Sequence, residues 1–87
     1  MGKTIHSADN ERLLALLVER RKTAGLTQEA LAQRLSKPQS FVSKYETGER
    51  RLDVIEFIDV ASAIGFDPAA LIRLLHRQPR TKSTRPA

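Results

Sequence analysis

Apolar residues recur along most of the chain at spacings of three and four, the period of one face of an α-helix. A first helix is predicted to start near Ser7 or Asp9, whose polar side chains suit a helix N-terminus, and to stop at Gly25. Its inward face consists of Leu13, Leu16, Leu17 and Ala24. No stretch alternates apolar and polar positions as a half-buried strand would. The pattern therefore predicts an all-α fold.

Two short helices follow in close succession. Thr27 is a suitable N-cap for a second helix of about nine residues. Pro38 fits the first position of a third helix, where its missing N–H costs nothing, and Gly48 ends that helix. The predicted inward positions are Ala30, Leu31, Leu35, Val42 and Tyr45. Two helices with so short a connection must cross steeply, which is the helix-turn-helix arrangement.

Two further helices complete the domain. Asp53 and Glu56 have the spacing of a capping box, which opens a fourth helix, and Gly65 closes it. Asp67 followed by Pro68 is a cap and a first-position proline, which open a fifth helix. The predicted buried stripe of the fourth helix is Val54, Phe57, Ile58, Ala61 and Ile64. The expected architecture is five short helices with tight connections.

Composition limits the chain to one small domain with polar ends. Its 87 residues are 40% hydrophobic but only 5% aromatic, so the core must be aliphatic. The last ten residues contain two prolines and no large apolar side chain. We expect a flexible N-terminus over residues 1–6, one domain over residues 7–77 and a disordered basic tail over residues 78–87.

Several kinds of chemistry lack the residues that they require. The chain has no cysteine, which excludes disulfides and thiolate zinc sites. His6 and His76 have no partner at a metal-ligand spacing, and no nucleophile–base pair is visible. The longest apolar run has six residues, far below the roughly 20 that span a membrane. We therefore expect no enzymatic activity, no metal, no cofactor and no membrane partner, and a cytoplasmic location.

Charge is segregated along the chain, whose formal net charge is +5 at pH 7. Residues 34–51 carry five bases against two acids, residues 52–70 carry four acids and no base, and residues 71–87 carry five bases and no acid. A basic surface attracts polyanions and an acidic surface repels them. A polyanionic partner is therefore expected at the basic middle of the domain.

Two segments carry a more specific signal than the charge. Residues 25–32 read GLTQEALA and residues 42–48 read VSKYETG. At this relative spacing they resemble the Cro/CI-type helix-turn-helix, or XRE, family of bacterial and phage transcriptional regulators. The resemblance covers about residues 10–75. It implies a compact five-helix, lambda-repressor-like DNA-binding domain, whose second and third helices form the helix-turn-helix.

The resemblance also implies roles for individual residues. The candidates for contacts with DNA bases, on the third helix, are Gln39, Ser40, Ser43 and Lys44. The candidates for contacts with DNA phosphates are Thr27, Gln28, Lys37, Arg50 and Arg51. A structural ion pair is expected between Arg21 and Glu46. The fifth helix is apolar on more than one side, and its Ile72 and Leu75 are candidates for the seam of a two-fold dimer.

The turn between the second and third helices departs from the family pattern. The family commonly has glycine, an apolar residue and then serine or threonine, whereas this chain has Ser36, Lys37 and Pro38. Ser36 has a steric cost if its backbone is left-handed. Pro38 removes the hydroxyl cap of the third helix. Phe41 is unusually large for its site, where it contacts a thymine methyl or sugar, or packs beside the second helix.

The expected function is sequence-specific binding of double-stranded DNA by a transcriptional regulator. We expect a dimeric repressor whose third helices read successive major grooves of a palindromic operator, about 34 Å apart. Two alternatives remain open: the DNA-binding antitoxin of a toxin–antitoxin pair, and a protein-interaction module that has lost DNA binding. A toxin or RNA polymerase would then be a further partner, and the basic tail a further phosphate contact.

Overall fold

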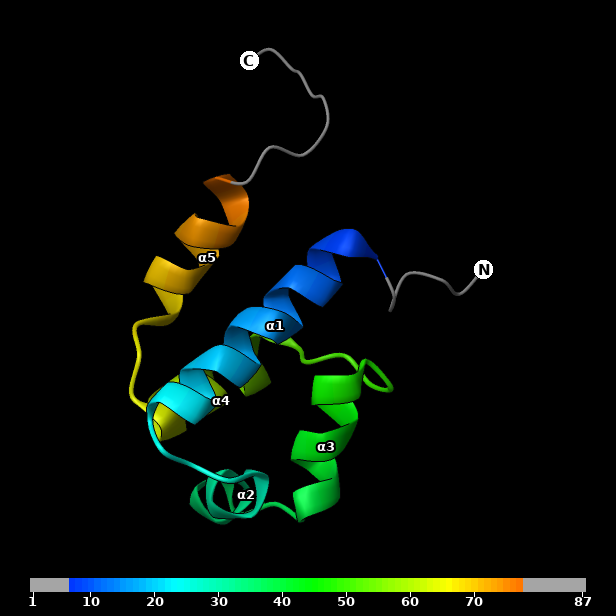
Figure 1. The fold of residues 1–87 in the computed structure, drawn as a ribbon, viewed down its shortest axis with the longest axis vertical. Coiled ribbons are helices and arrows are strands. Elements are labelled where there is room, and N and C mark those ends of the chain that lie inside the picture. Colours follow the sequence, from blue (N-terminus) through cyan, green and yellow to red (C-terminus); the bar gives the residue numbers. More distant parts are fainter. Residues whose placement is uncertain (1–6, 78–87) are drawn as a thin grey trace.

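The computed structural model describes residues 7–77, and helices are its regular elements in that range (Figure 1). In chain order they are α1 (Ala8–Thr23), α2 (Gln28–Leu35), α3 (Gln39–Thr47), α4 (Val54–Ile64) and α5 (Pro68–Arg77). The all-α, five-helix prediction is confirmed. The expectations for residues 1–6 and 78–87 lie outside the described residues.

Side-chain caps fix where the helices begin. The Oγ of Ser7 accepts a hydrogen bond from the Asn10 amide at 3.0 Å, and the Oγ1 of Thr27 accepts one from the Ala30 amide at 3.0 Å. At α4 both halves of the predicted capping box between Asp53 and Glu56 are present. These bonds satisfy backbone amides that the first turn of a helix leaves without partners.

The start of α3 differs from the prediction by one position. Pro38 is the N-cap of α3, with extended backbone, and the first helical residue is Gln39. Proline has no side-chain acceptor, so this helix lacks a side-chain cap. The backbone carbonyl of Pro38 instead accepts a hydrogen bond from the Phe41 amide at 2.9 Å.

The turn between α2 and α3 has the left-handed residue that the sequence raised as a possibility. Ser36 has φ 56° and ψ 43°, and no other non-glycine residue in residues 7–77 has a positive φ. This conformation lets the Lys37 amide donate to the carbonyl of Ala32 at 3.0 Å, which closes the end of α2. The chain can then turn directly into α3.

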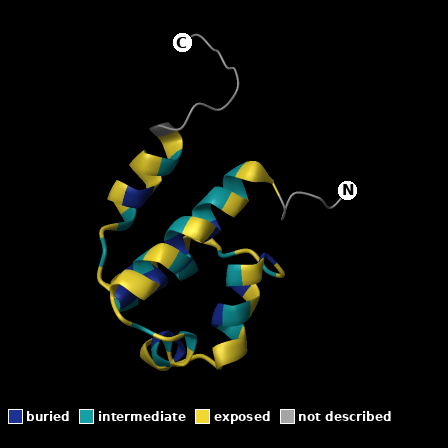
Figure 2. Cartoon of the chain, viewed as in Figure 1, coloured by how far each residue is buried: buried dark blue, intermediate teal, exposed yellow. Residues whose placement is uncertain are grey.

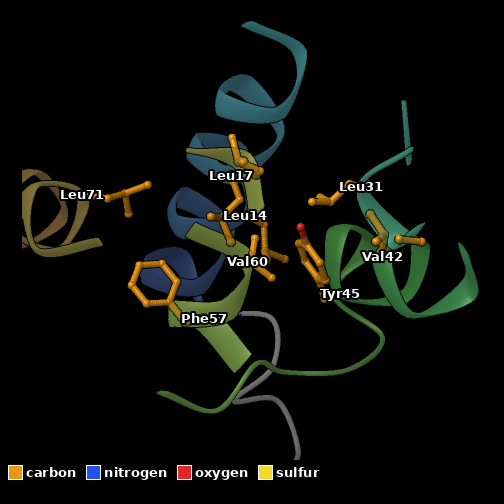
Figure 3. Close-up of a cluster of buried hydrophobic side chains, with 10 residues drawn as sticks. Leu14, Leu17, Leu31, Val42, Tyr45, Phe57, Val60 and Leu71 are labelled. Atoms are coloured by element: carbon orange, nitrogen blue, oxygen red, sulfur yellow. The ribbon is translucent and has the colours of Figure 1, made fainter. Parts of the chain in front are cut away.

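One hydrophobic core joins all five helices (Figures 2 and 3). α2 packs against α3 and α4, α1 packs against α3 and α5, and α5 also packs against α4. The largest side chains with almost no exposed surface are Tyr45, Leu17, Leu31, Leu71, Val42 and Val60. This packing holds α2 and α3 together at one end of the molecule, with α5 at the other (Figure 1).

The buried faces of α1 and α4 are partly different from those predicted. In α4, Val54 is 71% and Ile58 44% exposed, and Val60 is buried in their place. At α1, the C-cap residue Ala24 is exposed and Leu14 is buried. Both helices carry apolar residues on more than one side, so the helical period alone could not select the side that packs.

Candidate nucleic-acid interface

The exposed face of α3 carries the four candidates for base contacts. Val42 and Tyr45 turn the opposite face of α3 into the core, where both are fully buried. This packing leaves three of the candidates exposed and one half-buried. The exposed ones are Gln39, Ser40 and Lys44, and the half-buried one is Ser43. A helix with a polar, solvent-facing side and a buried, anchored side is suited to enter the major groove.

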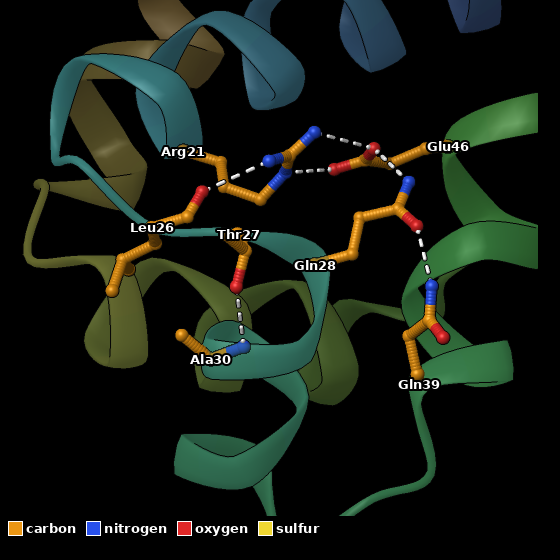
Figure 4. A network of polar contacts seen from close by, with 7 residues as sticks. All are labelled: Arg21, Leu26, Thr27, Gln28, Ala30, Gln39 and Glu46. Atoms are coloured by element: carbon orange, nitrogen blue, oxygen red, sulfur yellow. Dashed lines mark hydrogen bonds and ion pairs between the residues drawn. The ribbon is translucent and has the colours of Figure 1, made fainter.

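A polar network connects α1 and α2 to both ends of α3 (Figure 4). The Nε of Arg21 donates to Oε2 of Glu46 at 2.8 Å, and its Nη2 donates to Oε1 at 3.1 Å. The third nitrogen of Arg21, Nη1, donates to the carbonyl of Leu26 at 2.9 Å. The two side chains are only 10% and 6% exposed. The structure thus brings the two residues of the expected ion pair together.

The electrostatics of this pair follow from its geometry. The hydrogen bonds to Glu46 raise the pKa of Arg21, and its partial burial opposes that rise. Two parallel N–H···O bonds between an arginine and a carboxylate are stronger and more directional than a single contact. The pair therefore fixes the end of α1 against the last turn of α3.

Two glutamines extend the network to the N-terminus of α3. The Nε2 of Gln28 donates to Oε1 of Glu46 at 2.8 Å. The Nε2 of Gln39 donates to Oε1 of Gln28 at 3.0 Å. Gln28, a phosphate-contact candidate, and Gln39, a base-contact candidate, are therefore in direct contact. The resemblance placed both residues near DNA, but it did not predict their contact.

The remaining phosphate-contact candidates lie in different surroundings. Thr27 is exposed at the N-terminus of α2, where the helix dipole favours an anion. Lys37 is exposed in the turn, with its Nζ 5.2 Å from the centre of the Phe41 ring. Arg51 is exposed and takes part in an interaction of its own.

Arg50 is held by other parts of the protein. Its Nη1 and Nη2 donate to the two oxygens of Glu56 at 3.0 and 3.1 Å, and Nη1 also donates to the carbonyl of Arg51. Its guanidinium lies 4.9 Å from the Phe41 ring centre. The hydrogen bonds from Arg50 lower the pKa of Glu56, with the Asp53 amide adding to this effect. The loop after α3 is thus tied to the start of α4.

Sequence reasoning missed this arrangement around Phe41. The ring has Lys37 and Arg50 as its cationic neighbours and meets Tyr45 edge-on, with ring centres 5.7 Å apart. Phe41 is half-buried, and packing within the protein accounts for its size. Lys37 precedes α3 in the sequence and Arg50 follows it, so no helical spacing could have predicted that both cations lie near the Phe41 ring.

A second surface, away from α3, is apolar. Ile72 is 52% exposed and Leu75 is half-buried, whereas Leu71 of the same helix is buried in the core. Ile72 and Leu75 line a groove of about 190 Å³ with Leu13, Leu52, Asp53, Val54 and Phe57. Ile55 and Ile58 of α4 are also exposed. The two candidates for a dimer seam therefore line a largely apolar groove that α1, α4, α5 and the segment before α4 form together.

Residues 7–77 contain neither a cluster of metal ligands nor a membrane-spanning helix. No three histidine, cysteine or acidic residues in this range lie close enough together to hold a metal ion. None of the helices in the same range combines the length and the apolar composition needed to cross a membrane.

Comparisons with known proteins agree with this architecture. The helix-turn-helix family pattern matches residues 17–71. No curated protein matches the chain. A solved structure described as an XRE-family like protein from Pseudomonas syringae pv. tomato str. DC3000 is 59% identical, with a TM-score of 0.80, over 85% of this chain and 90% of that one. The chain therefore belongs to the XRE family of DNA-binding helix-turn-helix regulators.

Proposed function

We propose that this protein is a dimeric, sequence-specific repressor that reads the major groove of double-stranded DNA with α3. One observation carries the proposal. A network of hydrogen bonds holds the side chain of Gln39, on the exposed face of α3, in a fixed position through Gln28, Glu46 and Arg21. A solvated helix surface needs no such support, whereas base recognition requires side chains held in fixed positions.

Base contacts are assigned to the exposed side of α3. The amide of Gln39 can pair with N6 and N7 of adenine, and the ammonium of Lys44 can donate to O6 and N7 of guanine. Ser40 and Ser43 can donate or accept, which suits either base. Gln39 lies in the first turn and Lys44 in the second, so the two would read different base pairs.

Phosphate contacts are assigned to the N-terminus of α2 and to the loops beside α3. Thr27 and Gln28 lie where the α2 dipole attracts an anion, and Lys37 and Arg51 lie exposed at the two ends of α3. Arg50 is the weakest of the phosphate candidates, because its guanidinium already bonds Glu56. Its role in DNA binding would be to hold the loop that carries Arg51.

The dimer is assigned to the apolar groove that Ile72 and Leu75 line. A second copy of this chain is the proposed occupant, because a palindromic operator requires two copies related by a two-fold axis. Ile72 and Val54 border the groove while remaining mostly exposed, as residues that a partner covers would be. Ile72→Asp should give a monomer by sedimentation equilibrium. Ala70→Asp, on the other side of α5, should leave the dimer intact.

Selection of bound duplexes from a random pool tests the whole proposal. The wild-type protein should enrich a palindromic motif with half-sites about one helical turn apart. Lys44→Ala should relax one position in each half-site, whereas Arg73→Ala, a matched loss of one exposed charge on α5, should leave the motif unchanged. If no motif is enriched at moderate salt, DNA reading is refuted in favour of a protein-interaction module.

A further inference from the structure

Glu46 lies in the last turn of α3 and turns its side chain into the protein. Its side chain is only 6% exposed, and both carboxylate oxygens have partners: Oε2 accepts from Arg21, and Oε1 accepts from Arg21 and from Gln28. An ionised carboxylate can only accept hydrogen bonds, and a guanidinium can only donate them. The hydrogen-bonding direction at this end of the network is therefore fixed.

That fixed direction decides which way the amide of Gln28 points. The two ends of a glutamine amide have nearly the same shape but opposite hydrogen-bonding character. The Nε2 of Gln28 now lies 2.8 Å from Oε1 of Glu46. If the amide of Gln28 were reversed, its oxygen would lie at that distance from Oε1 instead. Two acceptors at that distance repel each other, so Gln28 must turn its NH2 group to Glu46 and its oxygen toward α3.

The orientation is then passed to Gln39. Since Oε1 of Gln28 is an acceptor, Gln39 must present its NH2 group to it, as it does at 3.0 Å. One N–H of Gln39 is used in this bond, which leaves the other N–H and Oε1 for an outside partner. This remaining donor–acceptor edge complements the N7 acceptor and N6 donor of adenine. A reversed Gln39 would commit its oxygen inward and present N–H donors, which suit guanine.

We infer that Glu46 is a specificity-determining positioning residue, which selects adenine at the base pair read by Gln39 without touching DNA. It acts through Gln28, and two hydrogen bonds from Arg21 hold its carboxylate in place (Figure 4). The inference rests on the proposed function, because it assumes that Gln39 reads a base. It adds that the base preference of Gln39, in the first turn of α3, depends on Glu46 in the last turn.

Glu46→Gln tests the inference, because a glutamine at this position can reverse the relay. The single oxygen of the new amide cannot accept from every donor that the carboxylate served. With the oxygen at the former Oε2 position, the NH2 group faces Gln28 and turns its amide over, and with the oxygen at the former Oε1 position the NH2 group faces Nε of Arg21. The direction of the relay is then no longer fixed. In the wild type we expect adenine to be preferred over guanine at one base pair by about 5-fold to 100-fold. Glu46→Gln should reduce that preference to less than about 3-fold or reverse it, and the base pair read by Lys44 should keep its preference.

A double-mutant cycle separates positioning from a general weakening of the fold. In a Gln39→Ala background the relay has no end point, so Glu46→Gln should change no base preference there. A purely structural role would lower affinity for all duplexes equally in both backgrounds. An unchanged adenine preference in folded Glu46→Gln protein would overturn the inference, while the enriched wild-type motif would leave the proposed function standing.

Side-chain NMR of the wild-type protein gives a measurement that does not require the variant to fold. One amide proton of Gln28 and one of Gln39 should exchange with solvent at least about 5-fold more slowly than those of Gln33, which is exposed on α2. Equal exchange at all three glutamines would overturn the inference, since the amides would then be free to turn.

Discussion

Replacing Ser36 with glycine is expected to stabilise the domain. Ser36 ends α2 in the left-handed conformation, with φ 56° and ψ 43°. Its side chain is exposed, and within residues 7–77 it makes no hydrogen bond. Its backbone amide does bond, to the carbonyl of Gln33 at 3.1 Å, and glycine retains that amide. The substitution therefore removes backbone strain and no hydrogen bond.

The size of the effect is a difference between two terms. A left-handed conformation costs an L-residue about 1–2 kcal/mol, which glycine does not incur. Glycine in turn makes the unfolded chain more flexible, which lowers the free energy of unfolding by about 0.4–1 kcal/mol. The net gain should be about 1 kcal/mol. In a domain of this size, that corresponds to a rise in Tm of about 4–8 °C.

Urea unfolding followed by far-UV circular dichroism measures this gain directly. Gly25→Ala is the matched control, because Gly25 ends α1 at φ +76° and an added Cβ would meet no atom within 4 Å. It should lower the free energy of unfolding by a similar amount, with an unchanged m-value. If Ser36→Gly is neutral or destabilising while Gly25→Ala destabilises, the left-handed backbone of Ser36 does not carry the strain that the prediction assumes.

Three further changes test other parts of the structure. Tyr45→Phe should raise the free energy of unfolding by about 1 kcal/mol in urea titrations, because the buried hydroxyl has no hydrogen-bond partner in residues 7–77; a loss of stability would contradict this. Arg21→Ala should lower it by about 3 kcal/mol, because Glu46 would remain buried without its countercharge; a loss below 1 kcal/mol would mean that water replaces the arginine. Arg50 depresses the pKa of Glu56, so the stabilisation is present above the ordinary glutamate pKa of about 4.3 and is lost as pH falls through the lower folded value. Glu56→Gln should therefore flatten the acid limb of a stability–pH curve, and an unchanged limb would assign that limb to other carboxylates.

The ends of the helices were predictable because their signals are local. Ser7, Thr27 and Asp53 cap helices through side-chain bonds that reach only three residues along the chain. Pro38 was misplaced by one position, since a proline suits both the N-cap and the first helical residue. Glycines at the helix ends provide signals of equally short range.

The buried faces were less predictable, because they depend on where distant helices pack. In α4, Phe57, Ala61 and Ile64 of the predicted stripe are buried, whereas Val54 and Ile58 are exposed and Val60 is buried instead. Contact with α2 and α5 decides which side of the helix packs. In the candidate site, too, the individual residues were predictable but their contacts were not. The motifs identified Gln28 and Gln39 separately, but their contact depends on how α2 crosses α3 through the left-handed Ser36.

The number of cations available in residues 34–51 makes tight DNA binding depend on dimerisation. Residues 34–51 have five bases, but Arg34 donates to the Ala63 carbonyl at 2.8 Å and Arg50 bonds Glu56. Fewer cations thus face DNA than the sequence suggests, and each phosphate neutralised contributes a limited share of the affinity. One domain would then bind weakly, and two linked domains would bind far more tightly. We therefore expect Ile72→Asp, which lies far from α3, to lower operator affinity and to halve the slope of log affinity against log salt concentration. An unchanged slope would mean that a single domain makes all the phosphate contacts.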